Sequence, residues 1–165
     1  MIWDTFLVSL FIYRHFFKIK ISQLKNIKMN NNNTMKISFF WALIVLGLNF
    51  HTQYELRGLF FGEEIKIAGA TGNMPYSLHY FTLLVNIVPL FFSLLTLYLN
   101  HKVFKIISLL YASLFCLLNG FHFISTAIES LSDLSQIGLL GFVLVSNVLL
   151  VLELFKWYKN DVLAL

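Results

Sequence analysis

Five side chains could bind a ligand or move a proton if the fold brought them together. They are three imidazoles, a carboxylate and an amide: His51, Glu55, His79, Asn119 and His122. Imidazoles and carboxylates bind Zn, Cu, Fe or Ni, and they relay protons because histidine titrates near neutral pH. Two imidazoles on different helices could instead ligate haem. These residue types leave the cofactor unknown, with a divalent transition metal a stronger candidate than haem. The simpler alternative is that His79 and Glu55 bond water or lipid headgroups at a membrane interface.

A second set of polar residues recurs with helical spacing. The intervals alternate between three and four residues along one segment: His79, Thr82, Asn86, Pro89, Ser93, Thr96 and Asn100. On a helix this set forms one continuous polar stripe, and a kink at Pro89 would bend the helix about that face. A stripe of this length predicts either a permeation path or a face packed against another helix.

Further polar residues lie in other apolar stretches. His51 and Glu55 are four residues apart, so both lie on one helix face. Ser146 and Asn147 fall near the middle of the last apolar stretch, and Glu153 falls near its end. We expect Glu153 to pair with Lys156 or Lys102.

The elements that must position these residues follow from the composition. The chain has 165 residues, of which 58% are hydrophobic and 12% charged, whereas a soluble domain has about 25% charged residues. This composition excludes a disordered chain and argues against a soluble enzyme. Four stretches are each long enough to cross a bilayer as a helix: residues 37–56, 77–100, 103–126 and 136–157. The predicted fold is all-α, a polytopic integral membrane protein with an antiparallel four-helix bundle over residues 35–165.

The basic residues predict the orientation of this bundle. Of the 12 Lys and Arg residues, ten lie before the first stretch, around the turn between the second and third (Lys102 and Lys105) or around the end of the fourth (Lys156 and Lys159), whereas Arg57 and Lys66 lie on the other side. By the positive-inside rule both termini are cytoplasmic, and we expect a bacterial inner membrane. Trp157 and Tyr158 suit an interfacial aromatic belt. The net charge of +4 therefore reflects topology and not nucleic-acid binding.

The segment 1–34 is a basic extension that we expect to be poorly structured or to lie at the interface, with a marginal fifth span as the alternative. Translation could start at Met1, Met29 or Met35. The single cysteine, Cys116, excludes a Cys-based zinc site and an intramolecular disulfide.

Helix depth places the candidate residues at one end. At 1.5 Å per residue, Glu55, His79 and His122 lie roughly 12–14 Å outward of the midplane, with His51 and Asn119 roughly 7 Å outward. We therefore expect an outward-facing His/Glu cluster in a non-enzymatic binding or transport component, or in an accessory subunit. The alternative is a metal- or haem-dependent redox protein that uses the same cluster. The expected partners are the lipid bilayer and either further copies of the chain or a larger membrane complex.

Overall fold

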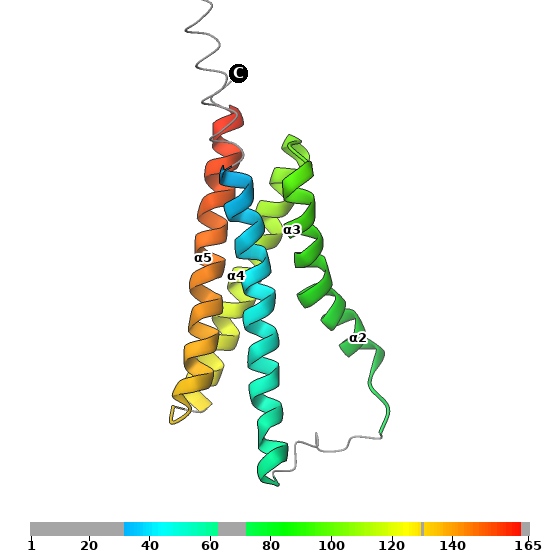
Figure 1. Ribbon diagram of the computed structural model, residues 1–165, viewed down its shortest axis with the longest axis vertical. Coiled ribbons are helices and arrows are strands. Elements are labelled where there is room, and N and C mark those ends of the chain that lie inside the picture. The colour runs from blue at the N-terminus through cyan, green and yellow to red at the C-terminus, as the bar shows by residue number, and fades with distance from the viewer. Residues whose placement is uncertain (1–31, 63–71, 130, 163–165) are drawn as a thin grey trace, which may run out of the picture.

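The structure, a computed structural model, describes residues 32–62, 72–129 and 131–162. This part of the chain is 91% helix and contains no strand. The first helix is α-helical over residues 32–55 and continues as the 3-10 helix η1 (Leu56–Phe61). The second comprises α2 (Tyr76–Thr82), the π-helical turn η2 (Leu83–Ile87) and α3 (Val88–Tyr98). The third and fourth are α4 (Lys102–Glu129) and α5 (Leu134–Val162) (Figure 1).

The all-α prediction is confirmed for the described residues, and all four predicted stretches are helices. Each of the four is long and apolar enough to cross a membrane, with lengths of 30, 23, 28 and 27 residues. At 1.5 Å per residue these helices extend over about 35–45 Å. The first, third and fourth helices run on past the predicted ends, whereas the second ends at Tyr98, short of the predicted residue 100. The first helix already includes residues 32–34, which we had assigned to the extension. The rest of that extension lies outside the described residues.

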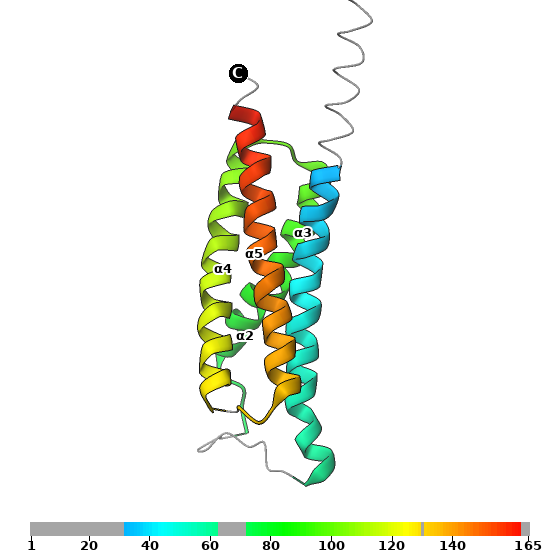
Figure 2. The ribbon, with the colours of Figure 1, turned by 90° about the vertical axis from the view of Figure 1, so that its left-hand side faces the viewer.

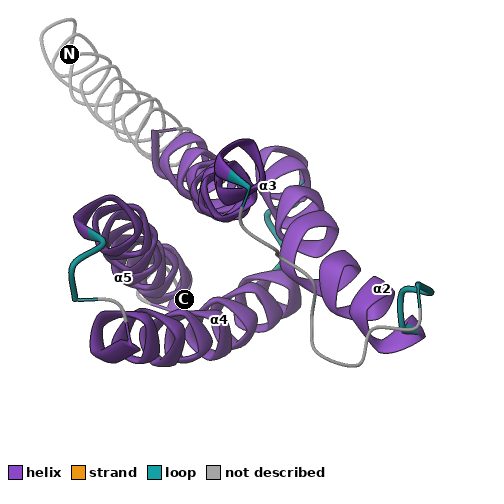
Figure 3. Ribbon diagram, turned by 90° about the horizontal axis from the view of Figure 1, so that it is seen from below, coloured by secondary structure: helices purple, strands orange, loops and turns teal. Residues whose placement is uncertain are grey.

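Consecutive helices run in opposite directions, so their ends meet at two ends of the bundle (Figure 1). We call the end with Glu55, Glu129 and Asp133 the acidic end, and the end with Lys36 and Lys102 the basic end. The first helix, α4 and α5 lie side by side along most of their length (Figure 2). In contrast, α2 diverges from the other helices towards the acidic end, as the view along the bundle shows (Figure 3).

The contact between the first helix and α5 depends on a glycine. A β-carbon added at Gly47 would lie 2.6 Å from Cγ2 of Val143. Val143 is fully buried, so it has little room to move away. Small residues allow helix backbones to approach closely in membrane proteins, where packing rather than hydrophobicity drives association.

A row of aromatic rings joins three helices in the half of the bundle nearer the basic end. Trp41 of the first helix stacks on Phe92 of α3 with ring centroids 5.3 Å apart. Phe92 stacks on Tyr111 of α4 at 5.1 Å, and Tyr111 stacks on Phe115 at 5.8 Å. These contacts hold α3 against its neighbours, whereas α2 has no comparable set of ring contacts among the described residues.

The π-helical turn lies directly before Pro89. The N–H of Val88 donates to the carbonyl of Leu83 in the π register, so the next acceptor, Leu84, would need the N–H that Pro89 lacks. The Tyr111 hydroxyl donates to the Leu84 carbonyl at 2.5 Å. A side chain of α4 thus satisfies a carbonyl that proline left unpaired.

At the basic end, the structure corrects the expected aromatic belt. Trp157 is buried with 1% of its surface exposed, so it belongs to the core. Lys105 is also buried, and its Nζ lies 4.4 Å from the centroid of the Trp157 ring. An ammonium over an indole face is a favourable cation–π contact, which accounts for a tryptophan that faces inward.

Candidate functional site

A row of polar side chains crosses three helices at the acidic end. Nε2 of Gln136 on α5 donates to Oε1 of Glu55 at 3.3 Å. Oε1 of Glu55 lies 3.3 Å from Nε2 of His51 on the same helix. Nε2 of His51 lies 3.1 Å from Nε2 of His122 on α4. The structure therefore brings together Glu55, His51 and His122.

Exposure decreases along this row from the carboxylate to the first imidazole. The Glu55 side chain is 47% exposed and that of His51 is 5% exposed. His51 is thus enclosed by protein, and its Nδ1 atom is buried without a hydrogen-bond partner among the described residues. The two imidazole rings meet edge to face, with centroids 5.1 Å apart and an angle of 74° between the ring planes.

The two imidazoles lie on a cavity of about 570 Å³, within the usual range of 300–1,000 Å³ for small-molecule sites. The first helix, Met74, α2, η2 and α4 form its walls. The polar lining residues are His51, Thr52, Glu55, Thr82, Asn86, Asn119 and His122. The apolar lining residues are Leu48, Met74, Leu78, Phe81, Val85, Phe115 and Leu118. Leu118 and Phe81 are half exposed, so the cavity opens to the surroundings of the bundle.

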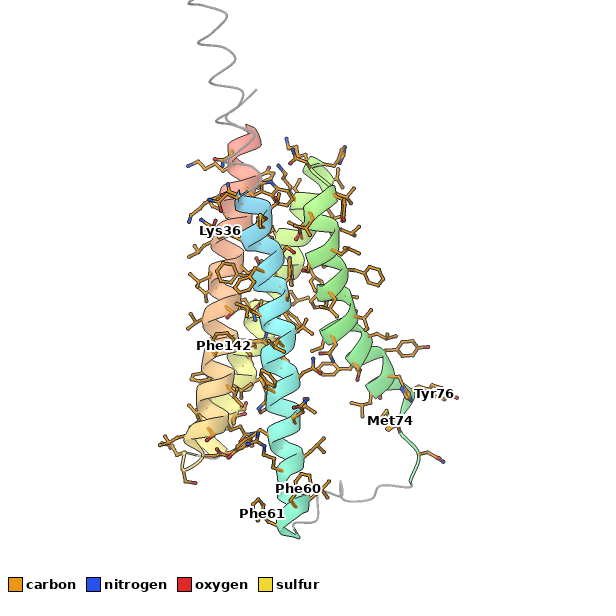
Figure 4. The ribbon with its side chains drawn as sticks, viewed as in Figure 1. Lys36, Phe60, Phe61, Met74, Tyr76 and Phe142 are labelled. Atoms are coloured by element: carbon orange, nitrogen blue, oxygen red, sulfur yellow. The ribbon has the colours of Figure 1, made fainter. Side chains whose placement is uncertain are left out.

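The divergence of α2 separates the cavity walls. Figure 4 shows Met74 and Tyr76 at the far end of α2, apart from Phe60 and Phe61 at the tip of the first helix. Tyr76 points away from the bundle and is 82% exposed. His79 packs near Tyr76, with ring centroids 6.3 Å apart, and does not line the cavity. The structure therefore does not bring His79 to the other candidate residues, because α2 carries it away from them.

Two residues of the predicted stripe line the cavity. Thr82 donates its hydroxyl hydrogen to the Leu78 carbonyl at 2.9 Å, so only its oxygen lone pairs remain for a ligand. Oδ1 of Asn86 accepts a hydrogen bond from Nδ2 of Asn49 at 3.4 Å, which leaves the Asn86 amide N–H groups for other partners. These two positions place hydrogen-bonding groups on the part of the cavity wall that α2 and η2 form.

The remaining residues of the stripe either pack against the first helix or are exposed. Ser93 donates to the Ser38 carbonyl at 2.9 Å, and the two hydroxyl oxygens lie 3.0 Å apart. Thr96 is buried and donates to the Phe92 carbonyl at 2.6 Å. Asn100 is exposed beyond the end of α3. The stripe is therefore an internal helix contact near the basic end and a cavity wall near the acidic end.

The polar residues predicted for α5 do not reach the cavity. Ser146 and Asn147 are buried in the bundle, and both polar atoms of the Asn147 side chain lack a partner among the described residues. Glu153 accepts a hydrogen bond from Lys156 at 2.7 Å, which is one of the two predicted pairs. An i,i+3 ion pair of this kind accounts for a carboxylate in an apolar helix.

The donor set does not match a metal centre. Among the described residues, no group of three or more His, Cys, Asp and Glu side chains is arranged to hold a metal ion. In the trio at the acidic end, His51 Nε2 already contacts both other members. The expected metal or haem therefore gains no support from this arrangement.

Two residues near the trio were not singled out from the sequence. Asp133 precedes α5 and accepts the N–H of Gln136 at 3.1 Å, and it also accepts the hydroxyl of Tyr54 at 2.9 Å. An acidic residue three positions before a glutamine is the spacing of a capping box, so this signal was present in the sequence. The hydrogen bond from Tyr54 has no comparable sequence signal, because its partner lies 79 positions away.

Comparisons with known proteins give no functional information, so a function can be argued only from the geometry of the site. No protein family, curated protein or solved structure matches this chain.

Proposed function

We propose that the four helices cross a membrane, with the basic end in the cytoplasm and the acidic end outside. The length and hydropathy of each helix support insertion. The described lysines Lys36, Lys102 and Lys156 support the orientation, since all lie towards the basic end. Reporter fusions at the C-terminus and within residues 63–71 test this topology, and a cytoplasmic reporter signal from the fusion within residues 63–71 would contradict it.

We propose that the protein binds a small amphipathic molecule in the cavity between the first helix, α2 and α4. The observation that carries this proposal is the presence of both apolar and polar side chains in the lining of one cavity. Its walls include apolar side chains such as Phe81, Val85 and Leu118, and its polar groups include His51 and His122. A molecule with an apolar chain and a polar head matches both surfaces, since ligand sites combine apolar walls with a few placed polar groups.

Two further features support binding over permeation through this chain. The described residues that line the cavity reach Asn86 along the stripe but not Thr96. Thr96 is 1% exposed and Pro89 is also buried, so packed side chains occupy the stripe beyond the cavity. A bound molecule would enter from the membrane, because the half-exposed Leu118 and Phe81 lie at the rim.

Photocrosslinking from the protein side tests the cavity without assuming a ligand. The photoreactive residue p-benzoylphenylalanine replaces either Leu118, which lines the cavity, or Leu117, which is 63% exposed and does not line it. We expect crosslinking at position 118 to give an adduct of one defined mass. Crosslinking at position 117 should give adducts with the range of masses of the bulk phospholipids. A cavity-filling Val85→Trp substitution should remove the discrete adduct. Identical adducts from both positions would contradict a binding cavity.

A further inference from the structure

The hydrogen positions in the imidazole pair follow from three contacts. Nε2 of His51 lies 3.3 Å from a carboxylate oxygen of Glu55. The negative charge of that oxygen favours a hydrogen on Nε2 of His51. Nδ1 of His51 is buried without a partner among the described residues. A buried donor without an acceptor is costly, so Nδ1 carries none and His51 is neutral.

The state of His51 determines that of His122. Nε2 of His122 lies 3.1 Å from Nε2 of His51, which already carries a hydrogen. Nε2 of His122 must therefore accept, because two N–H groups cannot face each other at hydrogen-bond distance. A neutral imidazole with one accepting nitrogen carries its hydrogen on the other. His122 is left with an Nδ1–H donor, and His122 lines the cavity.

The charges around the cavity restrict which polar head group of a ligand this donor would bind. None of the described residues that line the cavity is a lysine or an arginine. The described lining therefore offers no cation to a phosphate or sulfate, and the Glu55 carboxylate repels such a group. A trimethylammonium head has no lone pair to accept from Nδ1–H of His122, and Oε1 of Glu55 already accepts from Gln136 and contacts His51.

We propose that the cavity selects an uncharged amphiphile whose head presents a hydroxyl or carbonyl oxygen to Nδ1–H of His122. The amide N–H groups of Asn86 supply a second donor in the cavity lining, since its Oδ1 accepts from Asn49 and its Nδ2 is left for the ligand. The apolar chain lies against Phe81, Val85 and Leu118. This inference rests on the proposed binding function and adds the chemical class of the ligand.

Three photoprobes with one chain and different heads test this selection. They are hexadecanol, hexadecyl sulfate and hexadecyl trimethylammonium, each with a diazirine at mid-chain, added to the full-length protein in phosphatidylcholine nanodiscs. Labelling of the α4 peptide around residues 115–122 is measured by mass spectrometry against that of α5 residues 142–149. We expect the alcohol to label the α4 peptide at least several-fold more than either charged probe.

Substitutions identify the donor. His122→Phe keeps a flat ring but removes the N–H, and we expect alcohol labelling to fall about five- to tenfold, the effect of one hydrogen bond. The matched control is His79→Phe, a histidine outside the cavity, which should leave labelling unchanged. Glu55→Gln alters a side chain that is 47% exposed, so the protein should still fold, and it should raise sulfate labelling because the negative charge is removed.

The outcomes separate this inference from the proposed function. Equal labelling by the three heads, or preference for a charged head, would overturn the neutral-head inference while leaving the cavity intact if Val85→Trp still abolishes labelling. Unchanged labelling in a folded His122→Phe protein would overturn the role of His122. Labelling that Val85→Trp does not reduce would overturn the binding function itself.

Discussion

The hydroxyl of Tyr111 on α4 donates a hydrogen bond to the carbonyl of Leu84 in the π-helical turn at 2.5 Å. In the π register the partner of this carbonyl would be the nitrogen of Pro89, which carries no hydrogen. The bond therefore joins the π-helical turn η2 of the second helix to α4. It also lies at the point where α3, which packs against the bundle, gives way to α2, which diverges from it.

Removing that hydroxyl should weaken the bundle. We expect Tyr111→Phe to lower the free energy of unfolding by about 1 kcal/mol, since the Leu84 carbonyl loses its partner in an apolar environment. In a Pro89→Ala background the backbone N–H at position 89 can satisfy the same carbonyl, so Tyr111→Phe should cost less there. Unfolding in mild detergent measures both differences, and equal costs in the two backgrounds would refute this account.

The close approach at Gly47 predicts a strong dependence on side-chain size. Gly47→Ala should destabilise the protein by about 1–3 kcal/mol, because the added methyl group overlaps Val143 in a packed interface. Gly138→Ala is the matched control, since an added β-carbon there meets nothing within 4 Å. Thermal unfolding of both variants tests this contrast. Adding Val143→Ala to Gly47→Ala should recover part of the loss by making room for the methyl group.

At Asn147 we predict a substitution that raises the free energy of unfolding. Both of its side-chain polar atoms are buried without partners among the described residues. Replacing it with leucine, which branches at the same carbon and carries no polar atom, should raise the free energy of unfolding by about 1 kcal/mol, because the cost of the unpaired amide is removed. The contrasting variant is Ser93→Ala, which removes the hydrogen bond to the Ser38 carbonyl and should lower stability. A large loss of stability in Asn147→Leu would indicate that this amide has a partner.

Accessibility along the stripe distinguishes a cavity from a path across the bundle. In a background where the single cysteine Cys116 is replaced by alanine, we expect Thr82→Cys and Asn86→Cys to react with a small thiol reagent. Thr96→Cys should not react, because Thr96 is 1% exposed and packed between helices. The reaction rates in membranes measure this difference. Rapid reaction at position 96 would favour a permeation path instead.

Part of the candidate site could be predicted from the sequence. The pair His51 and Glu55 could be predicted from spacing alone, because residues four apart share one helix face. The depth estimate placed His122 near them, and the structure puts the two Nε2 atoms 3.1 Å apart. The same estimate placed His79 at this depth, but depth carries no information about the direction in which α2 leans.

What the sequence determined is local along the chain. Apolar stretches of membrane length give the four helices, and the polarity of the connecting segments distinguishes the two ends, since both depend only on the rise per residue and on side-chain transfer energies. The tertiary structure decided how the helices rotate and tilt against each other. In an apolar surrounding this depends on close packing and interhelical hydrogen bonds, such as Gly47 against Val143 and Tyr111 to Leu84. Those contacts join residues far apart in the chain, and they determine that His122 meets His51 while His79 lies outside the cavity.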